Sequence, residues 1–565
     1  MDAIAVMEAT APPAVRKTLA WPARMLLVLS LAALLFFARL GERAFWSEEM
    51  RWAQIPREML RSENYLLPTI NGKTYYDKPL GSYWLLLLAS VFTGEVNETA
   101  ARLPSAVFGL LGVALAMLIA RRLYDDDAAV WTGVILATSF SFVFFARTAS
   151  TDVETVTGVL AALWVFLRNE ARPPGWWTFG FWLVIALTSL TKGLLGFVLP
   201  MLIVGVYSTL GPMPPIRQWP AAFLARNRWF FNRVSLLAIP LATLVYLAPF
   251  LLSILTTGST EGLEMVYREN IRRFFDPVNH RGPIYLYGYV IFLLLAPWSL
   301  LLPAALAHAH GSTEKQDRGR SFALAYFWGT FVFFTLSSSR RSYYLLPILP
   351  AAAFLIARML AQRDTLSRTT YGLLLTGFFL SGLAVLMSGL ALSPPAWLLP
   401  APWNELPELP CPAAFLLMWL TSLAAVGFTL VKLSAKRIAW SFFVIAFSLM
   451  AYLYLGALPA IETYRTQKPF ANAAKDHLGT DVDRLALYRT REIVYYLDQP
   501  APIAEYHTRA ELLEAIDARS LRWIVVRRRD WEGLRTDGII VLAEATHPWE
   551  DTHEADGKLL LVEVR

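Results

Sequence analysis

The chain has 565 residues, of which 56% are hydrophobic, 13% aromatic and only 17% charged, and its mean hydropathy is +0.43. A soluble protein of this size carries about 25% charged residues. The composition therefore excludes disordered, collagenous and ordinary cytosolic classes and predicts an integral membrane protein, because such an apolar surface needs lipid around it. The net charge of +7 says nothing about nucleic acid, since the positions of the basic residues matter more than their sum. Cys411 is the only cysteine, which excludes an intrachain disulfide and cysteine-based metal sites.

Fourteen apolar runs along the chain are the candidates for membrane helices. They lie near residues 22–40, 79–94, 104–122, 127–146, 152–168, 175–190, 193–209, 235–256, 284–308, 322–338, 343–362, 371–392, 412–431 and 438–456. A spanning helix needs about 20 apolar residues. The run at 79–94 is among the shortest, follows a long polar loop and is rich in tyrosine and tryptophan. We therefore expect this run to lie in the membrane interface and the other thirteen to cross.

The distribution of basic residues favours thirteen crossings. If the run at 79–94 stays on the outer side, alternate loops place the basic residues inside, as the positive-inside rule requires. Those residues are Arg16, Lys17, Arg24, Arg121, Arg122, Arg168, Arg172 and the basic residues of 217–233, 315–320, 358–368 and 432–437. The N-terminus is then cytoplasmic and the C-terminus outside. We expect a cytoplasmic segment at 1–21 without a signal-peptide cleavage pattern, and a membrane domain at 22–456 with an outer loop at 41–103.

Residues 457–565 have the charged, globular composition of a small separate domain on the outer side. Apolar runs predict strands, and one amphipathic segment predicts a helix, so we expect an α/β domain. The strand-like runs are 485–488, 493–497, 521–526, 538–542 and 559–564, and the helical segment is 508–518. Asp481 and Asp483 are similar to the acidic motif of nucleotide-sugar transferases, but a solvated turn before a strand explains them better. We interpret His547 and His553 as surface residues.

Charged side chains gather in the loops that are predicted to face outward. Glu48 and Glu49 follow the first helix, and Arg51 either pairs with them in a hydrated helix cap or belongs to a site. Asp77 and Lys78 begin the interfacial run, where a helix N-terminus also favours an anion such as a lipid phosphate. The alternative for Lys78 is a side chain that only snorkels to the headgroups.

Further charged residues stand at the ends of predicted spans. Asp152 and Glu154 lie in a very short outer loop, and an acid held at that depth is a functional candidate. Lys192 interrupts an apolar stretch, either as a turn residue or to reach an anion. Basic residues in two outer loops break the positive-inside trend, and an anionic substrate is the simplest reason because arginine binds phosphate oxygens bidentately. The first loop carries them at 267–273 and 279–283, and the second at Arg340–Arg341. His280, with no second histidine nearby, is favoured as a hydrogen-bonding residue over a metal ligand.

The sequence contains no phosphate-binding P-loop, because residues 71–74 lack the earlier glycine, and no ATP-binding domain is predicted on the cytoplasmic side. An energy source must therefore arrive with the substrate. Outer acids, cations suited to phosphate and a membrane frame together favour transfer of a group from a lipid-linked phosphate donor.

Six motifs follow one another in order over most of the membrane region. They are Glu48-Glu49 with Arg51, Asp77-Lys78-Pro79-Leu80 with Tyr83-Trp84, Arg102-Leu103-Pro104-Ser105, Arg147 through Asp152, Leu190-Thr191-Lys192-Gly193 and Tyr343 through Pro350. Each motif alone is weak, but the ordered set resembles the GT-C membrane glycosyltransferases. Within that class it resembles the protein O-mannosyltransferase-like family that includes bacterial lipid A aminoarabinose transferases. One residue departs from the family, since Glu48 stands where aspartate is usual and is one methylene longer.

The resemblance implies a GT-C fold in a bacterial inner membrane, a sugar carried on undecaprenyl phosphate, and lipid A as acceptor at the periplasmic face. Aminoarabinose on lipid A would give resistance to polymyxin and cationic peptides. Lys78 and Arg272, with Tyr344 as hydroxyl donor, would hold the polyprenyl phosphate and stabilise the charge it gains on leaving. Glu48 and Asp152 would orient the acceptor, stabilise positive charge on the sugar or bind its ammonium group; a hydroxyl acceptor would need one of them as base. The other substrate-binding candidates are Arg51, Asp77, Lys192, Arg340 and Tyr343.

Three functions remain open from the sequence. The preferred one is a lipid-to-lipid aminoarabinose transferase, and a rival of the same class moves another polyprenyl-phosphate sugar to protein or glycan. A transporter or flippase for such lipids belongs to another class, and it is disfavoured because no internal repeat is found and the ionisable residues sit at one face. We predict no cofactor, with a divalent ion near the outer carboxylates as an alternative, and we expect membrane lipids but no nucleic acid as partners.

Overall fold

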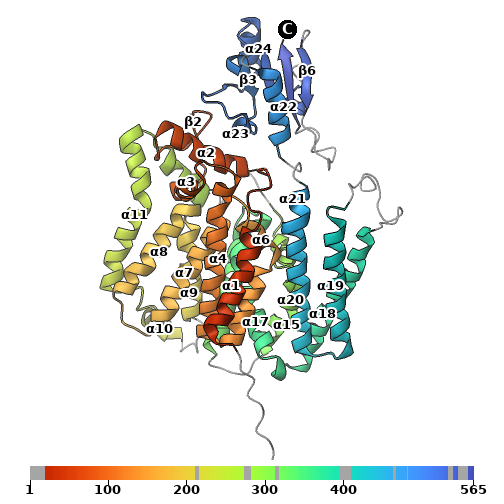
Figure 1. The fold of residues 1–565 in the computed structure, drawn as a ribbon. Coiled ribbons are helices and arrows are strands. Elements are labelled where there is room, and N and C mark those ends of the chain that lie inside the picture. The colour runs from red at the N-terminus through yellow and green to blue at the C-terminus, as the bar shows by residue number, and fades with distance from the viewer. Residues whose placement is uncertain are drawn as a thin grey trace, which may run out of the picture.

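A bundle of helices carries a smaller α/β domain at one end (Figure 1). The computed structural model describes residues 19–46, 48–209, 216–272, 282–311, 317–392, 409–461, 466–479, 482–531, 539–544 and 558–564. The first loop lies between the bundle and the domain, and it contains α2 (Glu49–Ser62) and the antiparallel hairpin of β1 (Thr69–Ile70) and β2 (Lys73–Thr74). We call this end of the bundle the domain end.

Apolar helices make up the bundle. They are α1 (Trp21–Phe37), α4 (Glu98–Leu123), α5 (Asp126–Ala137), α6 (Phe140–Ala146), α7 (Asp152–Asn169), α8 (Trp176–Lys192), α9 (Leu195–Thr209), α11 (Arg233–Thr257), α14 (Leu286–Leu294), α15 (Leu302–Gly311), α16 (Arg318–Leu336), α17 (Leu349–Ala361), α18 (Arg368–Ser388), α19 (Pro412–Val431) and α20 (Ala435–Ala451). Among the described residues, six helical segments are long and apolar enough to cross a membrane, or eight if two bent pairs each count as one span. The multi-pass membrane architecture is therefore supported, while the number of thirteen crossings stays a prediction.

Short helical segments connect or extend these helices. They are η1 (Ile216–Gln218), α10 (Trp219–Arg226), α12 (Glu261–Tyr267), η2 (Arg268–Arg272), η3 (Trp298–Leu301), η4 (Ser342–Ile348), η5 (Arg363–Thr365), η6 (Gly389–Leu392), η8 (Tyr452–Ala457) and α21 (Leu458–Ala460). Helix starts follow ordinary capping chemistry, because Asn97 accepts a hydrogen bond from the Ala100 amide before α4 and Asp125 accepts one from Ala128 before α5. Arg121 falls in the last turn of α4, where the helix dipole favours a cation.

The bundle has a buried centre and an apolar outer surface. Residues 349–360 of α17 are all buried, whereas peripheral helices expose leucines such as Leu236, Leu255 and Leu417, which are 66–81% exposed. An exposed apolar surface of this extent is stable only against lipid. The exposed leucines therefore indicate the surface that the bundle presents to the bilayer.

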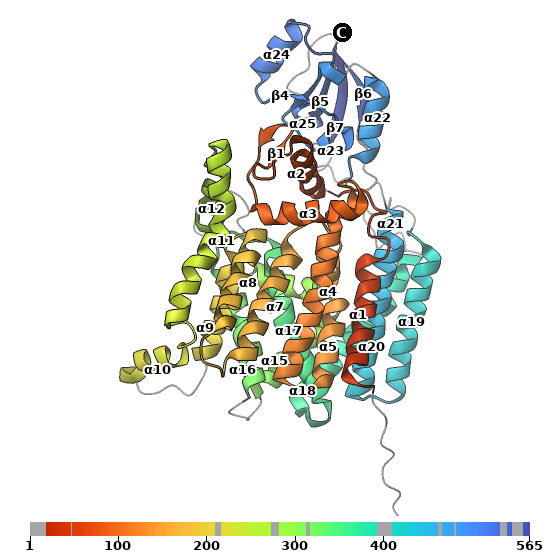
Figure 2. The same ribbon diagram turned by 60° about the vertical axis from the view of Figure 1, so that its left-hand side comes forward.

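Helix α3 (Leu80–Thr93) lies across the ends of the bundle helices rather than along them (Figure 2). It ends at Gly94, whose φ of +78° is a conformation that favours glycine. Its residues Val91 and Phe92 are 75% and 78% exposed. This orientation is the one that an interfacial helix requires.

The C-terminal domain has a five-stranded sheet in the order β4-β3-β5-β7-β6. The strands are β3 (Leu485–Tyr488), β4 (Ala504–Tyr506), β5 (Trp523–Arg527), β6 (Ile539–Glu544) and β7 (Leu559–Val564). β4 and β5 pair parallel to β3, with Leu485 opposite Trp523, and β7 is antiparallel to both β5 and β6. The helical elements are α22 (Lys468–Leu478), η9 (Val482–Arg484), α23 (Val494–Leu497), α24 (Arg509–Asp517) and α25 (Arg528–Trp531).

The prediction of an α/β domain agrees with this sheet, but one predicted strand is wrong. Residues 494–497 form helix α23, because all four side chains are buried and a short apolar run has no periodicity that separates a strand from a buried helical turn. Strand β4 escaped prediction because it has only three residues and none is buried. Of the polar residues noted in this region, Asp483 lies in η9, while Asp481, His547 and His553 lie outside the described residues.

Candidate active site

The two adjacent acids after α1 have different environments. Glu49 is 2% exposed, and its carboxylate accepts hydrogen bonds from Arg102 Nε and Nη2 at 2.9 and 2.8 Å. The backbone amides of Ala149 and Trp46 donate to the same carboxylate at 2.9 and 3.0 Å. Burial acts to raise the pKa of Glu49, but the Arg102 guanidinium outweighs it and holds the pKa below its usual 4.5. Glu49 therefore joins the start of α2 to α4 and to the loop before α7.

Glu48 belongs instead to a line of alternating charges. Its side chain is 62% exposed and lies 3.0 Å from Arg51, which also contacts Asp77 at 3.3 Å. Lys78 Nζ then lies 3.1 Å from Asp77 and 3.8 Å from Glu269 of η2. Burial lowers the pKa of Lys78 despite these two carboxylates. The line therefore includes a poorly hydrated ammonium group, which favours an incoming anion.

A second charged cluster lies where α7 begins and α8 ends. Asp152 and Lys192 form an ion pair, and their side chains are 9% and 13% exposed. Lys192 Nζ is 5.8 Å from the ring centre of Tyr343 and 5.6 Å from that of Tyr344, both on η4. These distances allow cation–π attraction. Arg341 donates a hydrogen bond of 2.7 Å to the Tyr343 hydroxyl, which fixes that ring.

The two clusters are neighbours because α3 and η2 contact both. Ser82 of α3, four residues after Lys78, donates a 2.7 Å hydrogen bond to the carbonyl of Thr191, beside Lys192. On η2, Glu269 contacts Lys78, and the next residue, Asn270, accepts a hydrogen bond of 2.7 Å from the Leu194 amide. Cations and carboxylates from α2, α7, α8, η2 and the segment before α3 therefore converge at the domain end, beside the tyrosines of η4.

Two predicted residues lie apart from this convergence. Arg340 donates hydrogen bonds to the carbonyls of Thr335 at 2.9 Å and Gly282 at 2.8 Å, so it closes the end of α16. Arg272 is exposed at the last residue of η2. His280, predicted to form hydrogen bonds, lies outside the described residues, as do residues 273–281 as a whole. A role for Arg272 or Arg340 toward substrate stays a prediction.

Parts of this chain are similar to proteins that are named as transferases. Residues 77–252 match the family model of dolichyl-phosphate-mannose-protein mannosyltransferases. The chain is 30% identical over 374 residues to the undecaprenyl phosphate-alpha-4-amino-4-deoxy-L-arabinose arabinosyl transferase of Pseudomonas paraeruginosa, with 64% of each chain covered. It is 30% identical to transferase 2 of that name from Pseudomonas fluorescens, over 60% of this chain and 59% of the relative. The chain thus spans less than two thirds of the length of these curated relatives.

Structural similarity to a solved protein covers almost the whole chain. ArnT from Cupriavidus metallidurans bound to undecaprenyl phosphate superposes with a TM-score of 0.69 at 20% identity, covering 96% of this chain and 99% of that one. This chain is a GT-C-fold membrane protein. The GT-C fold expected from the ordered motifs is therefore confirmed. The two charged clusters of the candidate site contain residues from five of those motifs: Glu48 to Arg51, Asp77-Lys78, Asp152, Lys192 and Tyr343-Tyr344.

Glu269 of the candidate site escaped prediction, whereas Glu154 was noted only as one of the two acids at the start of α7. The loop that contains Glu269 was considered for its arginines. The acid between basic residues in that loop is a signal that could have identified Glu269. Glu154 is buried in α7, where one oxygen accepts a 2.9 Å hydrogen bond from Ser105 and the other has no partner among the described residues. No group of three or more histidine, cysteine or acidic residues that could hold a metal is found within the described ranges.

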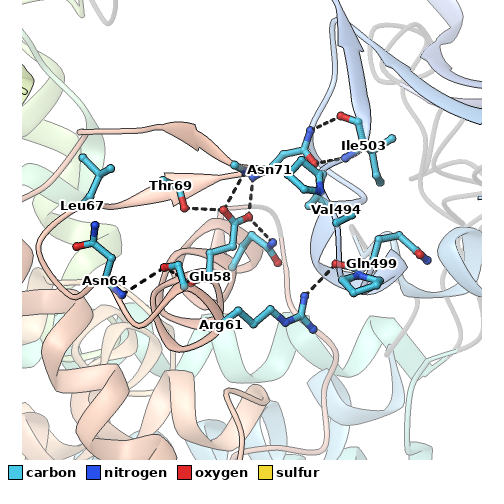
Figure 3. A pocket seen from close by; sticks show the side chains of 15 residues that line it. Glu58, Arg61, Asn64, Leu67, Thr69, Asn71, Val494, Gln499 and Ile503 are labelled. Atoms are coloured by element: carbon cyan, nitrogen blue, oxygen red, sulfur yellow. Dashed lines mark hydrogen bonds between the residues drawn. The ribbon is translucent and has the colours of Figure 1, made fainter. Parts of the chain in front are cut away.

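A cavity of about 380 Å³ separates α2 from the C-terminal domain (Figure 3). Glu58 accepts hydrogen bonds from the Thr69 hydroxyl and the Asn71 backbone amide, both at 2.6 Å. The Asn71 side chain donates a hydrogen bond to the Ile503 carbonyl and accepts one from the Ile503 backbone amide, both at 2.8 Å. Arg61 donates a hydrogen bond to the Gln499 carbonyl at 3.0 Å. Figure 3 shows these polar side chains lining the gap. The same helix α2 thus carries Glu48 and Arg51 at its start and holds the domain further along.

Proposed function

We propose that this chain is a glycosyltransferase that moves 4-amino-4-deoxy-L-arabinose from undecaprenyl phosphate to a lipid A phosphate. The proposal includes thirteen crossings of a bacterial inner membrane, with the domain end and the site on the periplasmic side. Its main support is the convergence of Lys78 and the Asp152–Lys192 pair beside α3, at one end of an apolar bundle. The likeness to transferases named for this donor is the second support.

The donor phosphate gains charge during transfer, and Lys78 is placed to stabilise that change. A sugar-linked phosphodiester carries one negative charge, whereas the released undecaprenyl phosphate carries nearly two. A cation at this position therefore stabilises the transition state more than the bound donor, which is the condition for catalysis. Lys78 is held between Asp77 and Glu269, so its ammonium group is preorganised. Tyr344 and Arg272 would add hydrogen bonds to the phosphate oxygens.

The acceptor phosphate supplies its own nucleophile. Its oxygen forms the new bond to the anomeric carbon while the bond from that carbon to the donor oxygen breaks, so the charge lost by one phosphate is gained by the other. No proton need be removed, which fits an Asp152 that is already paired with Lys192. In this mechanism Asp152 stabilises positive charge on the sugar ring, and the exposed Glu48 meets the sugar ammonium.

Mass spectrometry of lipid A tests the proposal. The chain is expressed in cells that make the aminoarabinose donor and lack their own transferase, and Lys78→Ala and Asp152→Ala are compared with the unchanged protein. The matched control is Arg217→Ala, which removes an exposed charge in η1. This turn directly precedes α10, which lies at the end of the bundle opposite the domain (Figure 2). We expect aminoarabinose on lipid A with the unchanged protein and the control, and its loss in both site variants at equal membrane levels.

The same cells separate the alternatives. If lipid A stays unmodified and the donor sugar is found on protein or glycan, the acceptor is protein or glycan and not lipid A. Movement of the donor across the membrane with no sugar released would contradict a transferase and support a flippase.

A further inference from the structure

Four arginines surround a small cavity at the domain end of α1. Arg39 and Arg43 follow α1, Arg102 belongs to α4 and Arg147 follows α6. The cavity has a volume of about 30 Å³, room for one or two small atoms, and it is open to the surface. Its other walls are Leu40, Phe144, Thr148, Tyr454, Leu458 and Pro459.

The charges around this cavity do not balance. Glu49 is shared between Arg102 and Arg43, at 2.8 and 3.6 Å. Arg39 contacts Glu42 at 2.5 Å, and that carboxylate is 49% exposed. Arg147 donates to two backbone carbonyls at the end of α1, at 2.7 and 2.8 Å, and no carboxylate of the described residues lies within ion-pair distance of it. Four guanidinium groups thus face two carboxylates.

The excess positive charge is energetically unfavourable in a partly buried position. Burial, together with the guanidinium groups of Arg102, Arg43 and Arg39, lowers the pKa of Arg147 to about 10. Burial also lowers the pKa of Arg43, and the neighbouring Arg102 adds to that effect. An anion in the cavity would remove this repulsion, which is the electrostatic signature of a site built for one.

The position of the cluster favours a phosphate. The guanidinium group of arginine matches phosphate oxygens bidentately, and the side chains of Arg39 and Arg43, which are 45% and 16% exposed, line the cavity. Below the cluster, α1 exposes Leu27 and Leu34, which are 64% and 48% exposed and seven residues apart on one face. An apolar strip under a cationic cluster suits a lipid whose acyl chains follow the helix and whose headgroup reaches the arginines.

We propose that Arg39, Arg43 and Arg147 form a binding site for a phosphate monoester group, separate from the site around Lys78 and Asp152. Its sources are a phosphate-bearing lipid headgroup or free phosphate. One oxygen enters the cavity beside Tyr454 and accepts from Arg147, and the others meet Arg39 and Arg43. Glu49 separates this site from Glu48, and the proposal does not depend on the transferase activity.

Native mass spectrometry of the full chain in detergent tests the site. The probes are phosphatidic acid, a phosphomonoester lipid, and phosphatidylcholine with matched acyl chains. One variant is Arg43→Gln with Arg147→Gln. Its control is Arg217→Gln with Arg228→Gln, two exposed arginines that flank α10 in the sequence, and α10 lies at the end of the bundle opposite the domain (Figure 2). We expect the unchanged protein and the control to retain phosphatidic acid about tenfold better than phosphatidylcholine, and the double variant to lose that preference.

A second variant keeps all four arginines and supplies the anion within the chain. Thr148 lines the cavity, so Thr148→Glu places a carboxylate beside the guanidinium groups. We expect it to lose the preference for phosphatidic acid while its melting temperature stays equal or rises. Equal retention of the two lipids by the unchanged protein, or full retention by Thr148→Glu, would overturn the proposal.

Inorganic phosphate distinguishes the two sources. Displacement of phosphatidic acid by millimolar phosphate shows that the site recognises the phosphate group by itself. Retention against that competitor assigns the site to a lipid headgroup. Either result, together with loss in Thr148→Glu, supports a phosphate site.

Discussion

At the scale of single residues, Glu48 and Glu49 show how neighbours in a sequence come to have different functions. Glu49 is buried and receives four hydrogen bonds, whereas Glu48 is exposed and forms an ion pair with Arg51. Breaking a buried ion pair leaves an uncompensated charge, which costs more than losing an exposed pair. Loss of the Glu49 carboxylate is therefore expected to lower mainly stability, and loss of the Glu48 carboxylate mainly activity.

Replacing each acid by glutamine separates these roles. Glu49→Gln leaves Arg102 without its buried carboxylate, so we expect about 3–5 kcal/mol less stability and a clear drop in melting temperature in detergent. Glu48→Gln should change the melting temperature little and lower transfer of the sugar. A Glu48→Gln protein that melts as early as Glu49→Gln would contradict this division.

The lowered pKa of Lys78 predicts that donor binding depends on pH. Its pKa lies below the usual 10.5 because burial disfavours the charged form. An anionic donor binds the charged form, so affinity should be full at low pH and fall as pH rises through the lowered pKa. Titration of undecaprenyl phosphate binding between about pH 7 and pH 10 measures this fall. Lys78→Arg, which stays charged throughout, should flatten the curve; the same fall in that variant would exclude Lys78 as its cause.

At the scale of elements, the position of α3 depends on a close contact with α8. A Cβ at Gly81 would lie 2.7 Å from the carbonyl oxygen of Leu190 and 2.9 Å from its Cβ. No side chain fits there without moving one helix. Because Lys78 precedes α3 and Lys192 ends α8, this contact sets the distance between the two charged clusters.

Gly81→Ala is therefore expected to reduce activity by separating the clusters. The matched control is Gly180→Ala in α8, where the added Cβ meets no atom within 4 Å and helix propensity gains up to about 1 kcal/mol. We expect at least tenfold less transfer in Gly81→Ala and unchanged transfer with equal or higher stability in Gly180→Ala. Lipid A mass spectrometry and melting curves give both readouts. Equal activity in the two variants would show that α3 is not held by this contact.

At the scale of the whole molecule, the C-terminal domain is held by polar contacts from the first loop. Asn71 bonds both backbone groups of Ile503 and the Glu505 carboxylate, and Arg57 and Arg61 reach Asp498 at 3.0 and 2.6 Å. Aromatic contacts add to this, since Tyr495 of α23 lies edge-on to Phe45 at 4.9 Å. The domain therefore stabilises the same segment that carries Glu48 and Arg51.

Asn71→Ala tests this coupling by removing three hydrogen bonds across the interface. Asn64→Ala is the control, because Asn64 lines the same cavity and its side chain bonds only within its own loop. We expect hydrogen exchange in β4 and α2 to become about a hundredfold faster in Asn71→Ala, because each of the three lost buried bonds costs about 1 kcal/mol. Exchange in β5 and β7 should be unchanged. Equal exchange in the two variants would show that the domain is held by its other contacts.

Features that depend on a short stretch of sequence could be predicted from the sequence alone. Apolar runs predicted a multi-pass membrane protein, and the short aromatic run at 79–94 was set apart because its length and flanks differ from those of a span. Lys78, Asp152 and Lys192 stood out because charge in an apolar context is costly and needs a reason. These inferences depend only on composition and periodicity, which are local properties of the chain.

Only the tertiary structure decided what each charge contacts. It pairs Glu49 with Arg102, 53 positions away, and Asp152 with Lys192, 40 positions away, and it turns Arg340 toward backbone carbonyls. It also brings Arg39, Arg43 and Arg147 around one cavity and makes a helix of residues 494–497. Burial and pairing depend on which distant segments pack together, and no local pattern contains that information. The sequence by itself therefore determined the membrane class and the candidate charges, and packing determined which of them form the site.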